Sequence, residues 1–501
     1  MSTAPTITKP PLLRNKMFWI GVLYFSEGFP LGVFYDVFPV QFRQQGVELA
    51  AIGFLSLLGL AWTLKFLWAP AVDHYRHHRR WILGANLVMA ALMLVFALYA
   101  EFGAWVWYAV GLFTLASATN DIAIDGYTIE MLETKELGIA NGLRIAFYRV
   151  GMLAAGGVLI LSDYLGWTGA YLGVVGTVAA VGLFILFKAP AEQVRDQSAE
   201  LKLSVELRAL LAHPAASAAV IALLIGVVWL ADRATKWSAG VEQFWVYCLG
   251  AGLVVWILIA IRQRVGRNLN VASTATLARG PMFGALLELV QRPYMLWIVV
   301  FILTFKLGDA AMGFMVKPFW VDAGFSASQI GLVSVNLGLV LSIAGGIAGG
   351  WVTDRVGIFH GLWSLGLLQA VSNLGYAWAA HVLPLSGVSD PSLTHQYLLY
   401  AASAVESFTG GLGTAAFLAF LMAIVNKEHS ATEYALLSSV FALSRSLAGW
   451  ASGYGAQYLG YAPYFLLTFF LAFPAYALLP WVHRMLNLGE AQSRVNARTA
   501  D

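Results

Sequence analysis

Charged side chains inside long apolar segments are the residues of this sequence best suited to do chemistry. A charge at the centre of a membrane-spanning helix costs roughly 2.5–3.5 kcal/mol, so such a side chain normally faces a partner or a watery cavity. Counting about 1.5 Å per residue from the segment ends places a small set of them about 14–18 Å deep, near mid-bilayer. They are Glu27, Arg149, Lys306, Glu406 and Arg445. Asp309 follows Lys306 by one helical turn, and Asp121 lies in the cytoplasmic half of its segment. A belt of charge of this kind is where a transporter holds its substrate.

The basic residues of this belt predict an anionic ligand. Arg149 and Arg445 are the strongest candidates, because neither has an opposite charge one turn away in its own segment. Arginine stays charged at this depth and can bind a carboxylate or a phosphate through two parallel hydrogen bonds. We assign Lys306 and Glu27 to the same substrate site. A structural role is the alternative for each residue. Lys306 and Asp309, for example, lie three residues apart and can neutralise each other.

The carboxylates of the belt predict coupling to protons. Glu406, Asp121 and Asp309 are the candidates, because a carboxyl group in the bilayer can bind or release a proton when its surroundings change. No Gly-x-x-x-x-Gly-Lys-Ser/Thr nucleotide-binding loop occurs, so an ion gradient must supply the energy. No His-Glu-x-x-His motif occurs either, and we expect neither a metal nor a cofactor.

Membrane-spanning helices must position these charges. The chain of 501 residues is 59% hydrophobic and 11% charged, with a mean hydropathy of +0.72, whereas soluble domains carry about 25% charged residues. Its apolar residues fall in blocks of about 20, the length that a helix needs to cross a bilayer. We predict fourteen helices, at 17–41, 51–71, 81–101, 104–130, 138–162, 168–188, 216–232, 244–262, 295–320, 327–351, 361–381, 396–425, 433–457 and 461–482.

Basic residues gather in alternate connections, which predicts the orientation of the chain. By the positive-inside rule both termini lie in the cytoplasm. Arg43 and Lys317 are among the few basic residues of the opposite connections. The net charge of +3 argues neither for a nucleic acid nor for a polyanionic partner, and we expect no nucleic acid partner; the lone cysteine, Cys248, excludes an internal disulfide. We expect the partners to be the lipid bilayer, an anionic small molecule and protons.

Internal repeats divide the chain into two halves. Gly46-Val-Glu-Leu-Ala-Ala-Ile52-Gly53-Phe-Leu-Ser56 recurs as Gly324-Phe-Ser-Ala-Ser-Gln-Ile330-Gly331-Leu-Val-Ser334, and Ala146-Phe-Tyr-Arg149 is matched by Ala442-Leu-Ser-Arg445. Repeats of this kind are typical of transporters and bring equivalent helices to opposite walls of one site. We predict two six-helix halves and an inserted helix pair. The parts are a cytoplasmic tail at 1–16, an N-terminal half at 17–188, a linker at 189–294 with the extra helices 216–232 and 244–262 and an amphipathic segment, a C-terminal half at 295–482, and a cytoplasmic tail at 483–501.

Short motifs along the chain resemble a known family. Gly350-x-x-x-Asp354-Arg355-x-Gly357 resembles the loop signature of major facilitator transporters, and Asp73 with Arg79 and Arg80 resembles a degenerate first copy. Motifs that resemble the AmpG permeases are Lys65-Phe-Leu-Trp-Ala-Pro70-Ala-Val-Asp73, Asp121-Ile-Ala-Ile-Asp125, Tyr148-Arg149-Val-Gly151-Met-Leu, Lys306-Leu-Gly308-Asp309 and Ser430-Ala-Thr-Glu433. The opening Tyr24-Phe-Ser-Glu27-Gly-Phe-Pro30 is similar to the siderophore-importing branch. The resemblance covers the twelve core helices and leaves out 190–294.

The resemblance implies a fold and a function. AmpG permeases import anhydromuropeptides in bacteria and share a family with acetyl-CoA transporters and siderophore importers. In the major facilitator fold, helices 1, 4, 7 and 10 line the central cavity, and helices 5 and 11 flank it. The chain is thus expected to be an all-α polytopic protein of the bacterial inner membrane that works as a monomeric, proton-coupled importer of an anionic solute. Anhydromuropeptide is the first expectation, and a siderophore or acetyl-CoA is the alternative.

Charged residues nearer the membrane surface predict latches and gates. A carboxylate beside a neighbouring helix end is favoured by the N-terminal dipole and by nearby arginines. The expected latch residues are Asp73, Arg79, Arg80, Asp354 and Arg355. Asp125 is expected to act as a gate at the cytoplasmic mouth, and Arg144 to extend to the inner membrane surface.

Two other classes of protein stay open at this point. Asp121 and Asp125 lie four residues apart on one helix face, a spacing that can hold Mg²⁺ and a diphosphate in an intramembrane prenyltransferase. Such enzymes need a second aspartate-rich helix, which the sequence lacks, so we do not expect an enzyme. The other class is a transporter-like sensor that signals without turnover, and uptake into proteoliposomes separates it from a carrier.

Overall fold

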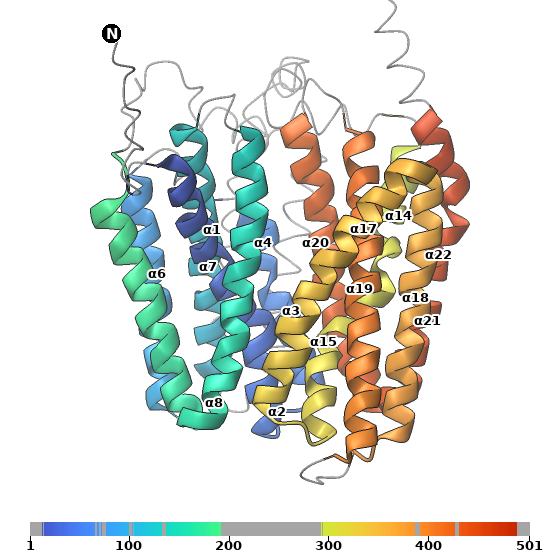
Figure 1. Ribbon diagram of the computed structural model, residues 1–501, viewed down its shortest axis with the longest axis horizontal. Helices are drawn as coiled ribbons and strands as arrows, with labels where there is room; N and C mark the ends of the chain where they lie inside the picture. Colours follow the sequence, from blue (N-terminus) through green and yellow to red (C-terminus); the bar gives the residue numbers. More distant parts are fainter. Residues whose placement is uncertain are drawn as a thin grey trace, which may run out of the picture.

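The computed structural model is a bundle of long helices that run side by side (Figure 1). It describes residues 13, 15–65, 68–69, 72, 77–99, 103, 105–132, 137–191, 292, 294–385, 391–425 and 430–487. Within these ranges the regular structure is helical, and no strand occurs. The inserted helices predicted at 216–232 and 244–262, and the amphipathic segment that follows them, lie outside the described residues.

The N-terminal half contains the helices drawn from blue to green in Figure 1. Its first span is divided into α1 (Lys16–Gly32), the π-helical η2 (Val33–Val37) and α2 (Phe38–Gln44). The second span is α3 (Leu49–Leu58) with α4 (Leu60–Leu64), and the next two are α6 (His78–Leu98) and α7 (Trp105–Met131). α8 (Leu137–Lys188) holds the fifth and sixth spans, because the chain turns at Gly166 with φ 67°. Glycine adopts this positive φ without a steric clash, since it has no Cβ.

The C-terminal half, drawn from yellow to red, repeats this plan. Its seventh span is α14 (Met295–Phe305) with α15 (Leu307–Asp322), and its eighth is α16 (Ala327–Gln329), the π-helical η6 (Ile330–Leu337) and α17 (Gly338–Val356). The following spans are α18 (Ile358–Val382), α19 (Leu393–Ala423) and α20 (Ser430–Leu459). The last is α21 (Tyr461–Phe470) with α22 (Phe473–Ala477) and a bent continuation, Leu479–Asn487. Each of the predicted core helices overlaps one of these spans.

Length and apolar composition suit these helices to a bilayer. Six helices of the described residues are long and apolar enough to cross a membrane, and the pair Tyr461–Ala477 and Leu479–Asn487, bent by 44°, makes a seventh if it is one span. Large apolar side chains cover the outside of the bundle; Ile129 and Ile347, for example, are each 72% exposed. In lipid this apolar surface has no cost, because the surrounding hydrocarbon is equally apolar, and the helices satisfy their own backbone hydrogen bonds.

Besides the second and the last spans, the first, seventh and eighth spans are interrupted within the bundle. In the first, Pro30 cannot donate the hydrogen bond of its helical turn, and the π-helical η2 follows at once. In the seventh, Lys306 has φ −102° and ψ 13°, which ends α14 and begins α15. In the eighth, the π-helical η6 precedes α17. π-helical turns are frequent at functional sites, so these spans are where we look for the site.

The two ends of the bundle differ. We call the end where α1 begins at Lys16 and the last helix finishes at Asn487 the terminal end, and the opposite end the far end (Figure 1). At the far end Asp322 of α15 accepts hydrogen bonds from Arg43 at 2.6 Å and from Tyr461 at 2.7 Å. The backbone N–H of Ser328 donates to Asp163 at 2.7 Å. Arg43 and Asp163 belong to the N-terminal half, so these bonds close the far end.

Glycines let helices from the two halves approach closely. α3 packs on α20, where a Cβ at Gly53 would lie 2.8 Å from the Cα of Gly453. The fifth-span part of α8 packs on η6, where a Cβ at Gly331 would lie 2.6 Å from the carbonyl oxygen of Gly156. Small residues permit such backbone contact in membranes. The halves are therefore held together by shape as well as by charge.

Candidate functional site

The two matched arginines lie on equivalent helices of the two halves. Arg149 lies on α8 and is half-buried, and Arg445 lies on α20 and is exposed. The Arg445 guanidinium lies 5.3 Å from the ring centre of Tyr35, a residue of the opposite half, and its charge acts on Arg149. Neither arginine forms an ion pair with a carboxylate of the described residues. Two like charges without a counter-ion are costly in a membrane unless water or an anion compensates them.

The N-half charge cluster consists of Tyr24, Lys65, Asp121, Asp125 and Arg144. The Lys65 Nζ lies 3.8 Å from Asp121 Oδ2 and 3.6 Å from Asp125 Oδ2. Asp125 Oδ1 lies 3.0 Å from the Arg144 guanidinium and accepts a 2.9 Å hydrogen bond from the Tyr24 hydroxyl. The Arg144 guanidinium also stacks 4.8 Å from the Tyr24 ring centre. The Arg144 side chain is 43% exposed and lies against Asp125 and Tyr24, and its expected extension to the membrane surface stays a prediction.

Glu27 lies beside this cluster with few partners. It is 8% exposed, and its Oε2 is buried without a hydrogen-bond partner among the described residues. The charges that act on it are those of Asp121 and Asp125, followed by Lys65 and Arg144. Asp121 is 5% exposed, and its Oδ1 is also buried without a partner in this part of the chain. Neighbouring carboxylates with unpartnered oxygens are suited to hold a proton.

A neutral network fixes the helices that carry these carboxylates. The Asn86 amide on α6 donates to Asn120 Oδ1 at 3.2 Å and to Ser26 Oγ at 3.4 Å. The Asn120 amide on α7 donates to the Ser26 carbonyl at 3.2 Å. Since Glu27 follows Ser26 and Asp121 follows Asn120, this network sets the positions of both carboxylates.

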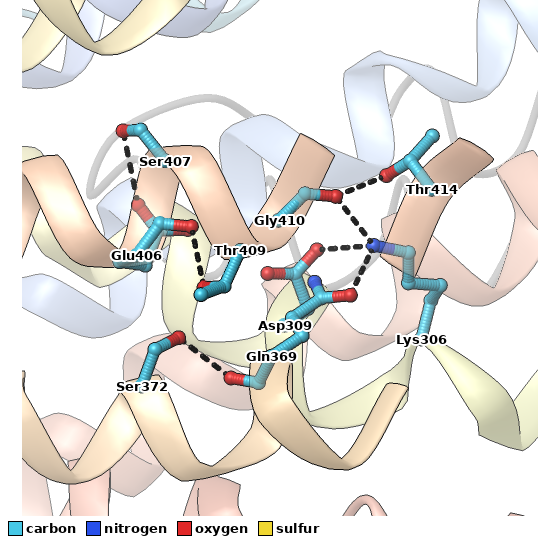
Figure 2. A network of polar contacts seen from close by, with 9 residues as sticks. All are labelled: Lys306, Asp309, Gln369, Ser372, Glu406, Ser407, Thr409, Gly410 and Thr414. Atoms are coloured by element: carbon cyan, nitrogen blue, oxygen red, sulfur yellow. Dashed lines mark hydrogen bonds and ion pairs between the residues drawn. The ribbon is translucent and has the colours of Figure 1, made fainter. Parts of the chain in front are cut away.

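The C-half charge cluster, Lys306, Asp309, Gln369 and Glu406, surrounds the break in the seventh span (Figure 2). The Lys306 ammonium, on a residue 3% exposed, donates to Gln369 Oε1 at 2.7 Å, to the Gly410 carbonyl at 3.4 Å and to Asp309 Oδ2 at 3.5 Å. Its three donors are thereby used. The Glu406 carboxylate accepts one hydrogen bond, from Ser407 at 3.4 Å, among the described residues. Lys306 is thus fully engaged, whereas Glu406 is loosely held.

Lys317 lies between the halves. The sequence analysis assigned Lys317 to a connection between two spans. The structure places it inside the helix α15, which continues to Asp322. Its side chain is 12% exposed, its Nζ lies 3.5 Å from Asp36 Oδ1 of η2, and it donates to Ser334 Oγ of η6 at 2.7 Å. The sequence analysis gave neither Asp36 nor Lys317 a role at a site, although the predicted spans 17–41 and 295–320 include both positions.

The predicted latch residues lie at helix ends. The Arg79 guanidinium donates to the carbonyls of Leu186 at 3.4 Å and Ala189 at 3.0 Å, where α8 ends. Arg80 is exposed at the start of α6. Asp354 and Arg355 are exposed at the end of α17, where the Arg355 guanidinium lies 3.8 Å from the Trp351 ring centre and Gly357 turns the chain with φ 87°. Asp73 lies outside the described residues.

The paired aspartates of α7 face cations. Asp121 and Asp125 lie within 4 Å of Lys65, and Asp125 also lies against Arg144. Within the described ranges no group of three or more His, Cys, Asp or Glu side chains is arranged to hold a metal ion. This arrangement suits charge balance and proton exchange between side chains.

Comparison with known sequences relates the chain to transporters. The sequence profile of the Major Facilitator Superfamily matches residues 17–394. The chain is 26% identical over 488 residues to the anhydromuropeptide permease of Escherichia coli (strain K12), a match that covers 96% of this chain and 82% of that protein. It is 23% identical over 488 residues to the putative transporter AmpG 4 of Rickettsia felis, with 94% and 98% covered.

Solved transporter structures share the fold. A bacterial homologue of the human lysosomal transporter Spinster has a TM-score of 0.62 at 13% identity and covers 96% of this chain and 99% of its own. An auto-inhibited POT family peptide transporter has a TM-score of 0.61 at 17% identity, with 94% and 96% covered. The all-α, polytopic fold predicted from the sequence is confirmed.

Proposed function

The chain belongs to the Major Facilitator Superfamily and is an integral membrane transporter rather than an enzyme, and we propose that it imports an anionic solute together with protons. Anhydromuropeptide is the first solute to test, since curated relatives carry that name. A siderophore and acetyl-CoA are the alternatives. We place the protein in a bacterial inner membrane, where it works as a monomer.

The observation that carries this proposal is the arginine pair. Arg149 and Arg445 come from equivalent helices of the two halves, and the charge of one acts on the other. Because no carboxylate of the described residues pairs with them, an incoming anion would supply the missing counter-charge. Each guanidinium can bind a carboxylate or phosphate through two hydrogen bonds. A solute with two separated anionic groups, one for each arginine, fits this arrangement. A solute with a single anionic group that both arginines bind also fits it.

Carboxylates on both sides of the pair are suited to carry the proton. Glu406 has one hydrogen-bond partner among the described residues, and Asp309 faces Lys306 in the same cluster. In the other half Asp121 and Glu27 have unpartnered oxygens. We assign the coupling proton to Glu406 first, with Asp121 and Asp309 as the other candidates, and Glu27 and Lys306 to the wall of the substrate site.

The closed far end supports a state that is accessible from the terminal end. With the predicted orientation, the far end faces the periplasm and the terminal end faces the cytoplasm. Asp125 then acts as a gate near the cytoplasmic mouth, and Arg79, Arg80, Asp354 and Arg355 brace the helix ends there. Reporter fusions after residue 238 should read as periplasmic, and fusions after 200 and 275 as cytoplasmic. If all three read as cytoplasmic, the inserted segments do not span.

Uptake into proteoliposomes tests the function. We expect anhydromuropeptide, ferric siderophore or acetyl-CoA to accumulate when an inward proton gradient is imposed, and accumulation to stop when a protonophore collapses it. Binding without accumulation would indicate a sensor. Accumulation that ignores the proton gradient but follows another ion would refute proton coupling and leave the anion site standing.

A further inference from the structure

A groove on the outside of the N-terminal half has a cation at one end and apolar side chains along the rest. It lies between α6 and α7 and has a volume of about 670 Å³. Along α6 it extends from His77 and Arg80 to Val88, and along α7 from Thr119 to Leu112. Val88 and Leu112 are 47% and 52% exposed, so the groove opens to the outside of the bundle. In a membrane the outside of the bundle is lipid.

The groove has about the length of one membrane leaflet. The segment 77–88 covers roughly 16 Å at 1.5 Å per residue, and one leaflet contributes about 15 Å of hydrocarbon. α6 begins at the terminal end (Figure 1), so the mouth of the groove, with Arg80, lies at that membrane surface and the apolar part extends toward the bilayer centre. A phospholipid of that leaflet has its polar and apolar parts in the same order.

Arg80 has no counter-charge among the described residues. It is exposed, and its guanidinium forms neither a hydrogen bond nor an ion pair with this part of the chain. Its neighbour Arg79, in contrast, donates to the Leu186 and Ala189 carbonyls. Arg80 also lies in the first turn of α6, where the helix dipole disfavours a cation. An anion at the mouth of the groove would compensate this charge.

Trp81 adds a hydrogen-bond donor beside Arg80. Its indole lines the groove and is partly buried, and its Nε1–H has no acceptor within the described ranges. Tryptophan is enriched at membrane surfaces, because its ring is apolar and its N–H is polar. A guanidinium suits a phosphate, and the indole N–H suits a second phosphate oxygen or an ester oxygen.

We propose that this groove binds an anionic phospholipid from the leaflet at the terminal end. The phosphate lies against Arg80 and Trp81, and one acyl chain lies along the groove over Gly84. A Cβ at Gly84 would have no atom within 4 Å, so this position leaves open space for the chain. Basic pockets between membrane helices bind anionic head groups in this way. The site is separate from the substrate site proposed between the halves.

The groove adjoins the helix that carries the paired aspartates. Thr119 lines the groove and accepts a 3.1 Å hydrogen bond from the Trp68 indole. Asp121 follows two residues later on α7, and its Oδ2 lies 3.8 Å from the Nζ of Lys65. An acyl chain packed between α6 and α7 therefore supports the N-half charge cluster from the lipid side.

A second groove shows what the first would be without its cation. It lies between α8 and the eighth span, has a volume of about 540 Å³, and is lined by Leu153, Asn336, Val340 and their neighbours. None of its lining residues is charged. An acyl chain fits either groove, so we expect only the first groove to select among head groups.

Native mass spectrometry of the purified, delipidated, full-length protein tests the proposal. Dioleoyl phosphatidylglycerol is the anionic probe, and dioleoyl phosphatidylcholine, whose choline group cancels the phosphate charge, is the zwitterionic probe. We expect one phosphatidylglycerol to bind about fivefold more tightly than phosphatidylcholine, which is the effect of one basic residue near an anionic head group. Phosphatidylglycerol should also raise the temperature of thermal unfolding, because a ligand of the folded state stabilises it.

Two variants with matched controls locate the bound lipid. Arg80→Gln should lose the fivefold preference, whereas Arg355→Gln, which removes another exposed cation from the terminal end, should keep it. Gly84→Leu should also lose the preference, because the leucine side chain occupies the space of the acyl chain. Gly176→Leu should keep it, although Gly176 is likewise an exposed helical glycine with no atom within 4 Å of a Cβ.

Equal binding of the two lipids by the wild type would overturn the proposal, as would wild-type selectivity in Arg80→Gln or in Gly84→Leu. Displacement of phosphatidylglycerol by an equal concentration of inorganic phosphate would show an anion site that ignores the acyl chain, and would also overturn it. A wild type without selectivity, together with a loss of thermal stability in Gly84→Leu, would assign the groove to another segment of the chain. If Gly84→Leu does not fold, Arg80→Gln and its control decide. None of these measurements depends on which solute is carried.

Discussion

The two charge clusters have the same formal surplus and different surroundings. In the N-terminal half, Lys65 and Arg144 face three carboxylates, Glu27, Asp121 and Asp125. In the C-terminal half, Lys306 faces two, Asp309 and Glu406. Each of these two sets thus has one carboxylate more than it has cations, with Lys317 left out because it pairs with Asp36. The arginine pair lies between the two clusters.

The difference is in how the surplus carboxylate is held. Glu27 lies next to the carboxylates of the N-half charge cluster. A proton on Glu27 can be shared with Asp121, which also has an unpartnered oxygen among the described residues. Glu406 stands against two lysines and a single hydroxyl. A proton lost from Glu27 can therefore pass to Asp121, whereas a proton lost from Glu406 leaves a carboxylate with one hydroxyl partner among the described residues. This teaches that equal charge in two repeats does not imply equal function.

The largest expected effect is on coupling. Glu406→Gln keeps the shape of the side chain and removes its charge, so uptake should lose its dependence on an imposed proton gradient while counterflow exchange survives. One proton that crosses with a monoanion moves no net charge, so a gradient of one pH unit supplies about 1.4 kcal/mol, which corresponds to about tenfold accumulation of solute. Initial rates and plateau levels in proteoliposomes measure this loss.

Glu27→Gln is the matched variant in the other half. We expect it to keep gradient-driven accumulation, because Asp121 remains to hold a proton. Equal loss of coupling in both variants would show that Glu27 and Glu406 do not differ in function. Unchanged coupling in Glu406→Gln would assign the coupling proton to Asp121 or Asp309 instead.

The next effect is on stability. Lys306→Met leaves Asp309 and Gln369 without their shared donor, and we expect a loss of about 2 kcal/mol, below the 3–5 kcal/mol of a fully buried pair because Asp309 is partly exposed. Lys65→Met should cost less, since Asp125 keeps Arg144 and Tyr24. Thermal unfolding of purified protein compares the two. A Lys306→Met, Asp309→Asn double variant should recover part of the lost stability. No recovery would show that the unpaired Asp309 carboxylate is not the cause of the loss.

Affinity for the solute tests the region between the clusters. Arg149→Lys and Arg445→Lys keep the charge and lose the planar fork, so each should reach the membrane and weaken binding at least tenfold, about 1.4 kcal/mol. Equilibrium binding to purified protein measures this. Wild-type affinity in both variants would make the arginines part of the helix-packing scaffold.

The smallest effect concerns the ring under Arg445. Tyr35→Leu removes a cation–π contact worth about 0.5–1 kcal/mol and should weaken solute affinity about two- to fivefold, because the guanidinium is less well oriented. Tyr35→Phe keeps the ring and serves as the control. An equal loss of affinity in Tyr35→Phe and Tyr35→Leu would assign the hydroxyl, and not the ring, to binding.

Sequence reasoning was strongest where the repeat gave two copies. The matched motifs at Arg149 and Arg445 predicted helices on opposite sides of one interface, and the structure brings the residues within electrostatic reach. The spacing of Lys306 and Asp309 predicted their 3.5 Å contact. The core spans followed from apolar length, because a bilayer fixes how long a helix must be.

The sequence failed where a helix is irregular. Depth counted at a constant rise does not show which way a side chain points after a π-helical turn or a break. For this reason the sequence did not predict the contact between Lys317 and Asp36. Lys65 was recognised as part of a family motif, but no role at the site was predicted for it. The sequence did contain one signal for Lys317: it is a lysine inside a predicted span and directly precedes a proline.

The break at Lys306 determines which states the carrier can visit. α14 packs against α20 and α22 within its own half, whereas α15 also packs against α2 and α3 across the boundary. Because the hydrogen-bond ladder is interrupted between them, α15 can tilt while α14 stays in place. The protein can then shut both compartments off from a bound solute by moving one helical segment.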